Sequence, residues 1–221
     1  MIPKKRPSLC GRLHSLSHFM GTVAGIWPMS DADATSRRRK RTPKPLDAGR
    51  LEELALAYVA RFSTSAGKLR AYLKRKLRER GWDGDSEPPL EQLVTRFVEK
   101  GYVDDAAYGR AKAQGLLARG YGGRRVEQAL RAAEIGEDVR SKLAPDEAER
   151  RAAIVALARR RRFGPYGGPL PPDAEAAHKL REKRLAALLR AGHDFDAARR
   201  VLEAATIEEL AEWVAEAAQD D

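Results

Sequence analysis

The side chains of this chain that could perform metal or acid–base chemistry are few. Its 221 residues include one cysteine and four histidines. Cys10, His14 and His18 would share one face of a helix, but three ligands fall short of the roughly four that a structural zinc site uses. His178 and His193 are isolated, and we expect both to be exposed and non-catalytic. The sequence therefore predicts no metal or cofactor site, and the single cysteine allows no internal disulfide.

Two short motifs look like chemical signatures but have a simpler structural explanation. The pair Asp104-Asp105 could bind a divalent metal, yet carboxylates at the start of a helix commonly cap its N-terminus. The turn Gly120-Tyr-Gly122-Gly123-Arg124 precedes a helix, but it lacks the preceding strand and the Lys-Ser/Thr pair of a phosphate-binding P-loop. We expect a turn with an N-terminal helix cap there. Neither motif supports catalysis, and we predict that the chain is not an enzyme.

The positive charge of the chain is concentrated near its N-terminus. Lys and Arg total 42 against 32 Asp and Glu, a net charge of +10. Residues 1–50 contribute +8 of this charge, and residues 51–221 contribute +2. The last 21 residues hold seven acids and no basic residue. A strongly basic protein suggests a nucleic-acid partner, but the nearly neutral body argues against a protein that grips free DNA along its length.

Two basic stretches in the body are candidate contact surfaces. When Leu69, Leu73 and Leu77 face a core, the helical period places the neighbouring cations on an outer arc, where we expect no acidic residue at the i±4 positions. The first stretch consists of Arg70, Lys74, Arg75 and Arg78, and the second of Arg159, Arg160 and Arg162. Such faces suit an acidic protein surface or phosphates. A polar outer face is also what any surface helix shows, so that simpler interpretation stays open.

The segment 1–45 has no helical period and is interrupted by prolines. Its run from Arg37 to Arg41 would repel itself in a compact fold, so we expect a disordered basic tail. The run is either a solvated tail or an arm that attracts phosphates with an affinity that falls with salt. Met1 and Met29 are both candidate starts, and residues 1–28 would be untranslated if Met29 is the start.

From Leu51 onward, apolar residues recur with the spacing of amphipathic helices, and no strand pattern persists. We expect the last helix, Ile207 to Ala218, to be acidic outside and to pack Leu210, Trp213 and Val214. In the helix expected from Leu90 to Gly101, the residues predicted to face inward are Leu93, Val94, Phe97 and Val98. The other helices are expected at 51–62, from just after Ser65 as far as Gly81, and at 104–120. A further helix contains Val126 and Leu130 and ends near residue 136, and the remaining ones are expected at 138–143, 152–163, 176–191 and 196–204.

The predicted helices recur in sets of three, with corresponding leucines at Leu77, Leu130 and Leu188. Glycine- and proline-rich loops at 82–89 and 164–173 interrupt the repeat. We predict an all-α fold of tandem three-helix repeats stacked into an elongated rod, because each repeat contacts mainly its neighbours. The predicted segments are the tail at 1–45, repeats at 46–103, 104–144 and 145–206, and an acidic helix at 207–221.

Four segments of this sequence, taken in order, resemble landmarks of the RecX regulators. They are Tyr58 to Leu73, Gly101 to Tyr108, Gly120 to Val126 and Leu189 to Phe195. The resemblance covers residues 50–205 and is strongest in the first two repeats. Gly123 stands where members commonly have proline, so that turn is expected to be looser here. The terminal Arg-Gly-Phe element of the family appears in altered form.

The resemblance implies a cytoplasmic, non-enzymatic modulator of the RecA recombinase, acting in recombinational DNA repair and the SOS response. Members form a curved rod of three-helix repeats that lies in the groove of the RecA–DNA filament and usually restrains its ATPase and strand exchange. The implied partner is therefore the RecA nucleoprotein filament, with weak non-specific DNA contact, no membrane and no cofactor, and the protein is expected to be a monomer. The candidate filament contacts are Arg70, Lys74, Arg75, Arg78, Arg124, Arg125, Arg159, Arg160 and Arg162.

Two other functions remain open at this point. A direct DNA-binding protein with helix-turn-helix units would bind duplex DNA without RecA and with a steep salt dependence. A helical-repeat scaffold would serve an unrelated protein partner. The sequence also leaves open whether such a regulator inhibits or stimulates RecA.

Overall fold

The computed structural model describes residues 44–219. Within this range every regular element is a helix, and a single parallel bridge between Leu46 and Trp82 is the one strand-like pairing. The prediction of an all-α fold is therefore confirmed. The predictions on the basic tail, on a site at Cys10, His14 and His18, and on the start codon fall on residues outside the described range.

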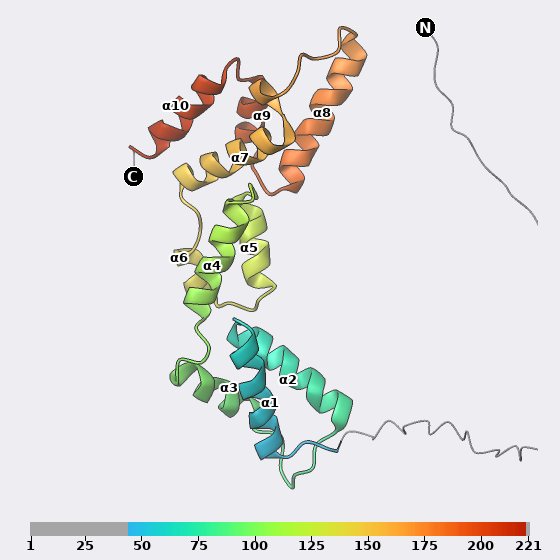
Figure 1. The fold of residues 1–221 in the computed structure, drawn as a ribbon, viewed down its shortest axis with the longest axis vertical. Coiled ribbons are helices and arrows are strands. Elements are labelled where there is room, and N and C mark those ends of the chain that lie inside the picture. The colour runs from blue at the N-terminus through green and yellow to red at the C-terminus, as the bar shows by residue number, and fades with distance from the viewer. Residues whose placement is uncertain (1–43, 220–221) are drawn as a thin grey trace, which may run out of the picture. The chain divides into compact units, whose positions relative to one another are not determined.

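The first three helices pack around one core (Figure 1). They are α1 (Ala48–Arg61), α2 (Ala66–Arg80) and α3 (Leu90–Glu99). Helix α2 begins after Ser65, whose hydroxyl accepts a hydrogen bond from the Lys68 amide at 3.3 Å. It ends at Gly81, whose φ of 81° is a conformation that glycine adopts at little cost. The buried core residues are Leu46, Leu51, Ala55, Leu69, Leu73, Leu90, Leu93, Val94, Phe97 and Val103.

Helix α3 corrects one prediction about its buried face. Leu93, Val94 and Phe97 are buried, but Val98 is 44 % exposed. The buried stripe of this short helix also includes Leu90. Val98 lies about 100° beyond Phe97, outside the edge of that stripe. Spacing alone made the inward face too wide.

The next two sets of helices follow the same order along the chain. The second set is α4 (Asp105–Leu117), α5 (Gly123–Arg131) and α6 (Glu137–Lys142). The third set is α7 (Glu147–Arg161), α8 (Ala174–Arg190) and α9 (Phe195–Glu203), with the 3-10 turn η1 (Gly164–Tyr166) after α7. Each set surrounds its own apolar cluster. Tandem three-helix repeats therefore describe the fold.

Helix α7 begins earlier than predicted, at Glu147 rather than Ala152. Asp146 accepts a hydrogen bond from the Glu149 amide at 2.7 Å, and the Glu149 side chain reaches back to the Asp146 amide. This capping box satisfies two backbone donors and so extends the helix past its apolar stripe. Helix α10 (Ile207–Ala217) packs against α7 and buries Leu210 and Trp213, as predicted.

Side chains near residue 65 join the first set of helices to the second. The Ser65 hydroxyl donates to the carbonyl of Ala133 at 2.6 Å, and Asp105 accepts from the Ala66 amide at 2.7 Å. Asp104 caps its own helix by accepting from the Ala107 amide at 2.8 Å. Both members of the Asp104-Asp105 pair therefore cap helices, but Asp105 caps α2 rather than α4.

Backbone atoms join the second set of helices to the third. The Gly122 amide donates to the carbonyl of Ala191 at 3.0 Å, and the Arg124 amide donates to the carbonyl of Gly192 at 3.3 Å. A Cβ atom on Gly122 would lie 2.4 Å from the Gly192 carbonyl oxygen, too close for any real contact. The glycine-rich turn thus precedes a helix start, as expected, and the absence of a side chain on Gly122 permits its close approach to the third set.

Candidate functional site

The predicted basic arc on α2 is divided in the structure. Lys74 and Arg78 are exposed and, within residues 44–219, form no ion pair. Arg70 lines the same 470 Å³ hollow, but its guanidinium pairs with Glu91 at 2.9 Å and with Glu134 at 3.6 Å. Neither partner occupies an i±4 position of α2, which is where the sequence analysis looked for acids. Glu91 lies on α3 and Glu134 follows α5, so a helical wheel of α2 cannot show them.

Arg75 does not line this hollow and lies on the side of α2 that carries Tyr72. Its guanidinium is 3.6 Å from Glu79, one turn along the helix, and lies 5.6 Å from the ring centre of Tyr72. The expectation of no acid at i±4 is wrong for Arg75, because Glu79 occupies its i+4 position. This leaves Lys74 and Arg78 as the cations of the predicted arc that are available to a partner, and we call this pair the α2 basic face.

The predicted arginines of α7 lie beside a separate hollow. Arg159 and Arg160 line a cavity of 610 Å³ together with Tyr166 and Val214. Both arginines are exposed. Arg162 is also exposed, but it ends α7 with a φ of 56° and does not line this cavity. The structure therefore brings Arg159 and Arg160 together and separates Arg162 from them.

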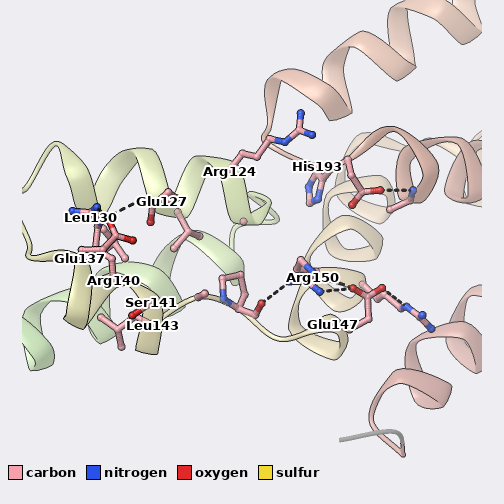
Figure 2. A pocket seen from close by; sticks show the side chains of 18 residues that line it. Arg124, Glu127, Leu130, Glu137, Arg140, Ser141, Leu143, Glu147, Arg150 and His193 are labelled. Carbon is pink, nitrogen blue, oxygen red and sulfur yellow. Dashed lines mark hydrogen bonds and ion pairs between the residues drawn. The ribbon is translucent and has the colours of Figure 1, made fainter.

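A third cavity, of 430 Å³, lies where the second set of helices meets the third (Figure 2). Figure 2 shows Arg124 and His193 away from the end formed by Leu130 and Leu143. Arg124 is exposed. Arg125 does not line the cavity, and its guanidinium donates to the Gln128 side chain at 2.6 Å. The two predicted arginines of the glycine-rich turn therefore face different surroundings.

The other arginines that line this cavity form ion pairs with glutamates that also line it. The Arg140 guanidinium lies 3.1 Å from Glu127, and the Arg150 guanidinium lies 2.7 Å from Glu147. Hydrogen bonds from neighbouring arginines hold the pKa values of Glu127 and Glu147 below their usual range, so both carboxylates stay charged. Because the charges compensate one another, the cavity is not a strong site for anions.

His193 is the clearest departure from the predicted site chemistry. It was expected to be exposed, but its side chain is only 3 % exposed and its Nε2 atom lies 3.0 Å from the carbonyl oxygen of Gly120. Burial lowers the pKa of His193, although the Gly120 hydrogen bond and the nearby Asp194 charge act in the opposite direction. The partner is 73 residues away, so sequence spacing gave no signal. His178 is exposed, as expected.

The described part of the chain offers no metal centre or membrane span. Within residues 44–219 no group of three or more His, Cys, Asp or Glu side chains is arranged to hold a metal ion. No helix in that range combines the length and apolar character needed to cross a bilayer.

One partly exposed aromatic cluster was missed by the sequence analysis. Tyr58 and Tyr72 stack with ring centres 4.2 Å apart, and Phe62 lies 5.4 Å from Tyr58. Phe62 is 53 % exposed. The apolar spacing of α1 places Tyr58 and Phe62 on one face, but only the packing of α2 against α1 adds Tyr72 and its neighbouring cations.

Comparison with known proteins shows similarity to one group. The chain is 30 % identical over 179 residues to the regulatory protein RecX of Myxococcus xanthus, covering 77 % of this chain and 94 % of that protein. It is 36 % identical over 107 residues to the regulatory protein RecX of Thermus thermophilus, covering 48 % and 71 % of the two chains. No family model matches the chain.

A solved structure supports the same fold. The crystal structure of RecX from Lactobacillus salivarius matches with a TM-score of 0.53 over 75 % of this chain and 97 % of that one. The two sequences are 14 % identical, so this comparison bears on the fold alone.

Proposed function

This chain belongs to the RecX family of regulatory proteins, and we propose that it binds the RecA–DNA filament and restrains RecA ATP hydrolysis and strand exchange in recombinational DNA repair. The observation that carries the proposal is the 30 % identity extending over 94 % of the Myxococcus xanthus relative. We further propose that the protein acts in the cytoplasm as a monomer and performs no catalysis of its own.

We propose that the filament contacts come from cations on several repeats, with repeats bounded at 46–103, 104–144 and 145–206. Among the predicted contacts, the exposed cations without an ion pair or a side-chain hydrogen bond in residues 44–219 support this view, because they lie on different helix sets. They are Lys74 and Arg78 on α2, Arg124 on α5, Arg159 and Arg160 on α7, and Arg162 at the end of α7. Dispersed cations suit a broad contact with an acidic or phosphate-bearing surface better than a single pocket would.

The direct test is RecA-catalysed ATP hydrolysis on single-stranded DNA, titrated with the full chain. The rate should fall as the protein is added and reach a plateau once the filament is saturated. A gel-filtration measurement on the free protein checks the monomer. An unchanged hydrolysis rate, with no association of the chain with RecA filaments in a sedimentation assay, would contradict the proposal.

The α2 basic face provides a more specific test. The double variant Lys74→Glu, Arg78→Glu should raise the concentration needed for half-maximal inhibition by about 5- to 30-fold at low salt, because two favourable charge contacts become repulsive. The difference should shrink as salt screens the charges. Arg70 is left unchanged because it pairs with Glu91 and Glu134 at the junction.

A matched control makes the same charge change elsewhere. Arg181 and Lys183 on α8 are exposed and lie outside the proposed contacts. The variant Arg181→Glu, Lys183→Glu should inhibit as the parent protein does. Equal weakening by both double variants would assign the effect to net charge and remove the α2 basic face from the interface.

A further inference from the structure

The aromatic cluster beside the first core includes a ring that the core does not bury. We call Tyr58, Phe62 and Tyr72 the aromatic platform. The rings of Tyr58 and Tyr72 are nearly parallel, with 12° between their planes, and the Phe62 ring is tilted by 48° to that of Tyr58. Packing against the first core accounts for the partly buried Tyr58 and Tyr72. It does not account for Phe62, which is more than half exposed and lies outside that core.

Three cations surround the platform. The Arg61 guanidinium lies 5.9 Å from the ring centre of Phe62. The cationic groups of Arg75 and Lys76 lie 5.6 and 5.8 Å from the ring centre of Tyr72. Cations at these distances are attracted to the faces of aromatic rings. The platform therefore combines exposed aromatic surface with positive charge.

The acidic groups near the platform leave its charge positive. Glu79 pairs with Lys76 at 2.6 Å and with Arg75 at 3.6 Å. The Lys76 hydrogen bond lowers the pKa of Glu79, so this carboxylate is charged at neutral pH. Arg61 is exposed and, within residues 44–219, has no ion-pair partner. Arg61 thus supplies a positive charge that no described carboxylate compensates.

The platform and the α2 basic face occupy different sides of α2. With 3.6 residues per turn, Tyr72 and Lys76 lie about 160° around the helix from Lys74 and Arg78. Lys74 and Arg78 line the hollow beside Glu134, which none of the platform residues lines. A ligand on the platform can therefore be tested separately from a partner on the α2 basic face.

We propose that the aromatic platform binds single-stranded nucleic acid. A base stacks on the exposed ring of Phe62, and the backbone phosphates contact Arg61, Arg75 and Lys76. Proteins that bind single strands without sequence preference combine aromatic rings, which stack on any base, with cations that follow the phosphates. In a duplex the base faces are covered by neighbouring base pairs, so the platform favours a single strand. The proposal does not depend on RecA binding.

The test separates stacking on bases from attraction to phosphates. The full chain is titrated in the absence of RecA against two fluorescent strands of equal length, an oligothymidylate and its abasic counterpart, and binding is followed by anisotropy. Both strands carry the same phosphates, so any attraction of the basic residues at 37–41 to phosphate cancels in the ratio of the two dissociation constants. The unmodified protein should prefer the strand with bases by about fivefold or more.

Two variants and a matched control assign this preference to the platform. Phe62→Ala should bring the ratio close to one, and Arg61→Ala should weaken binding to both strands equally while reducing the salt dependence. Phe195 is 51 % exposed on α9, so Phe195→Ala removes a similar exposed ring and should leave the ratio unchanged. Circular dichroism spectra and melting curves establish that each variant folds.

Two results would overturn the proposal. One is a parent protein that binds both strands equally. The other is Phe62→Ala with an unchanged preference for the strand with bases. If Phe62→Ala keeps this preference but loses inhibition of RecA ATP hydrolysis, the platform is a contact for protein rather than for nucleic acid. The strand preference is measured without RecA, so a parent protein that fails to inhibit RecA could still show it. The proposed function and the proposed strand-binding site can therefore fail independently.

Discussion

His193 is a titratable side chain enclosed where the second and third sets of helices meet. It hydrogen-bonds to Gly120 in the turn that also brings Gly122 against Gly192. Because burial lowers its pKa from the ordinary value of 6.5, the folded protein holds the ring neutral at pH 7. A neutral imidazole with Nε2 protonated donates to the carbonyl, which fixes the tautomer. The residue therefore acts as a pH-dependent structural contact.

Acid should weaken the fold through this histidine. Below about pH 6.5 the unfolded state binds a proton that the folded state binds less readily, so stability present above that pH is lost as the pH falls through the lowered pKa. His193→Gln retains an N–H donor for Gly120 but cannot titrate. The variant should lose less of its free energy of unfolding than the parent between about pH 7.5 and pH 5 in urea titrations.

The matched control for this prediction is the exposed histidine. His178 is 69 % exposed beside Glu182, so His178→Gln should leave the pH dependence of the parent protein nearly intact. An identical loss of stability in the parent and in His193→Gln would show that other groups govern the acid response.

Helix termini carry the contacts between sets of helices. Asp105 is the first residue of α4, yet its carboxylate accepts from the Ala66 amide at the start of α2. A carboxylate at a helix N-terminus is favourable because it satisfies a free amide and opposes the positive end of the helix dipole. One side chain therefore caps a helix of the first set from a position in the second.

Removing the Asp105 carboxylate should destabilise the protein through α2. Asp105→Ala should lower the free energy of unfolding by about 0.5–2 kcal/mol, whereas Asp105→Asn keeps an acceptor oxygen and should recover most of it. Urea unfolding measures the loss, and hydrogen exchange should show faster exchange at the first amides of α2. In Asp104→Ala, hydrogen exchange should instead become faster at the first amides of α4, because Asp104 accepts a hydrogen bond from the Ala107 amide. Faster exchange in α4 but not α2 on loss of Asp105 would contradict the prediction.

At the scale of the whole described chain, each apolar core belongs to one stretch of sequence. The third core joins residues of α7, α8 and α9 to Leu210 and Trp213 of α10. Trp213 also lies against Arg151, whose guanidinium is 4.8 Å from the ring centre and donates to the Trp213 carbonyl at 2.7 Å. The acidic last helix is thus packed into the third core, whatever further role its outer charges have.

Loss of Trp213 should therefore loosen one part of the molecule before the others. Trp213→Ala should cost about 3–5 kcal/mol, the usual penalty for removing a large buried side chain. In hydrogen exchange, protection should fall in α7 and α10 and persist in α1 to α3, because stacked repeats depend mainly on their neighbours. Trp82 packs against the first core, so in Trp82→Ala protection should instead fall in α1 to α3 and persist in α7 and α10. Uniform loss of protection in both variants would show that the chain unfolds as one cooperative unit.

The sequence alone determined the helical class and nearly every helix. The reason is physical: apolar periodicity, caps such as Ser65 and stops such as Gly81 act within a few residues of one another. The same local rules correctly buried Leu69, Leu73 and Trp213. They also pointed to the family, because its landmarks are short segments in a fixed order.

Only the tertiary structure decided which side chains are free and which are paired. Arg70 meets Glu134, Asp105 meets Ala66, and His193 meets Gly120, each across a large separation in sequence. Periodicity reports which side of a helix is apolar, but it carries no information about what a neighbouring repeat presents to the other side. For that reason the sequence supplied the candidate cations, and the folded structure removed Arg70 from the α2 arc and revealed the aromatic platform beside it. The Arg75–Glu79 pair is different, because it is a local i,i+4 contact that could have been found in the sequence.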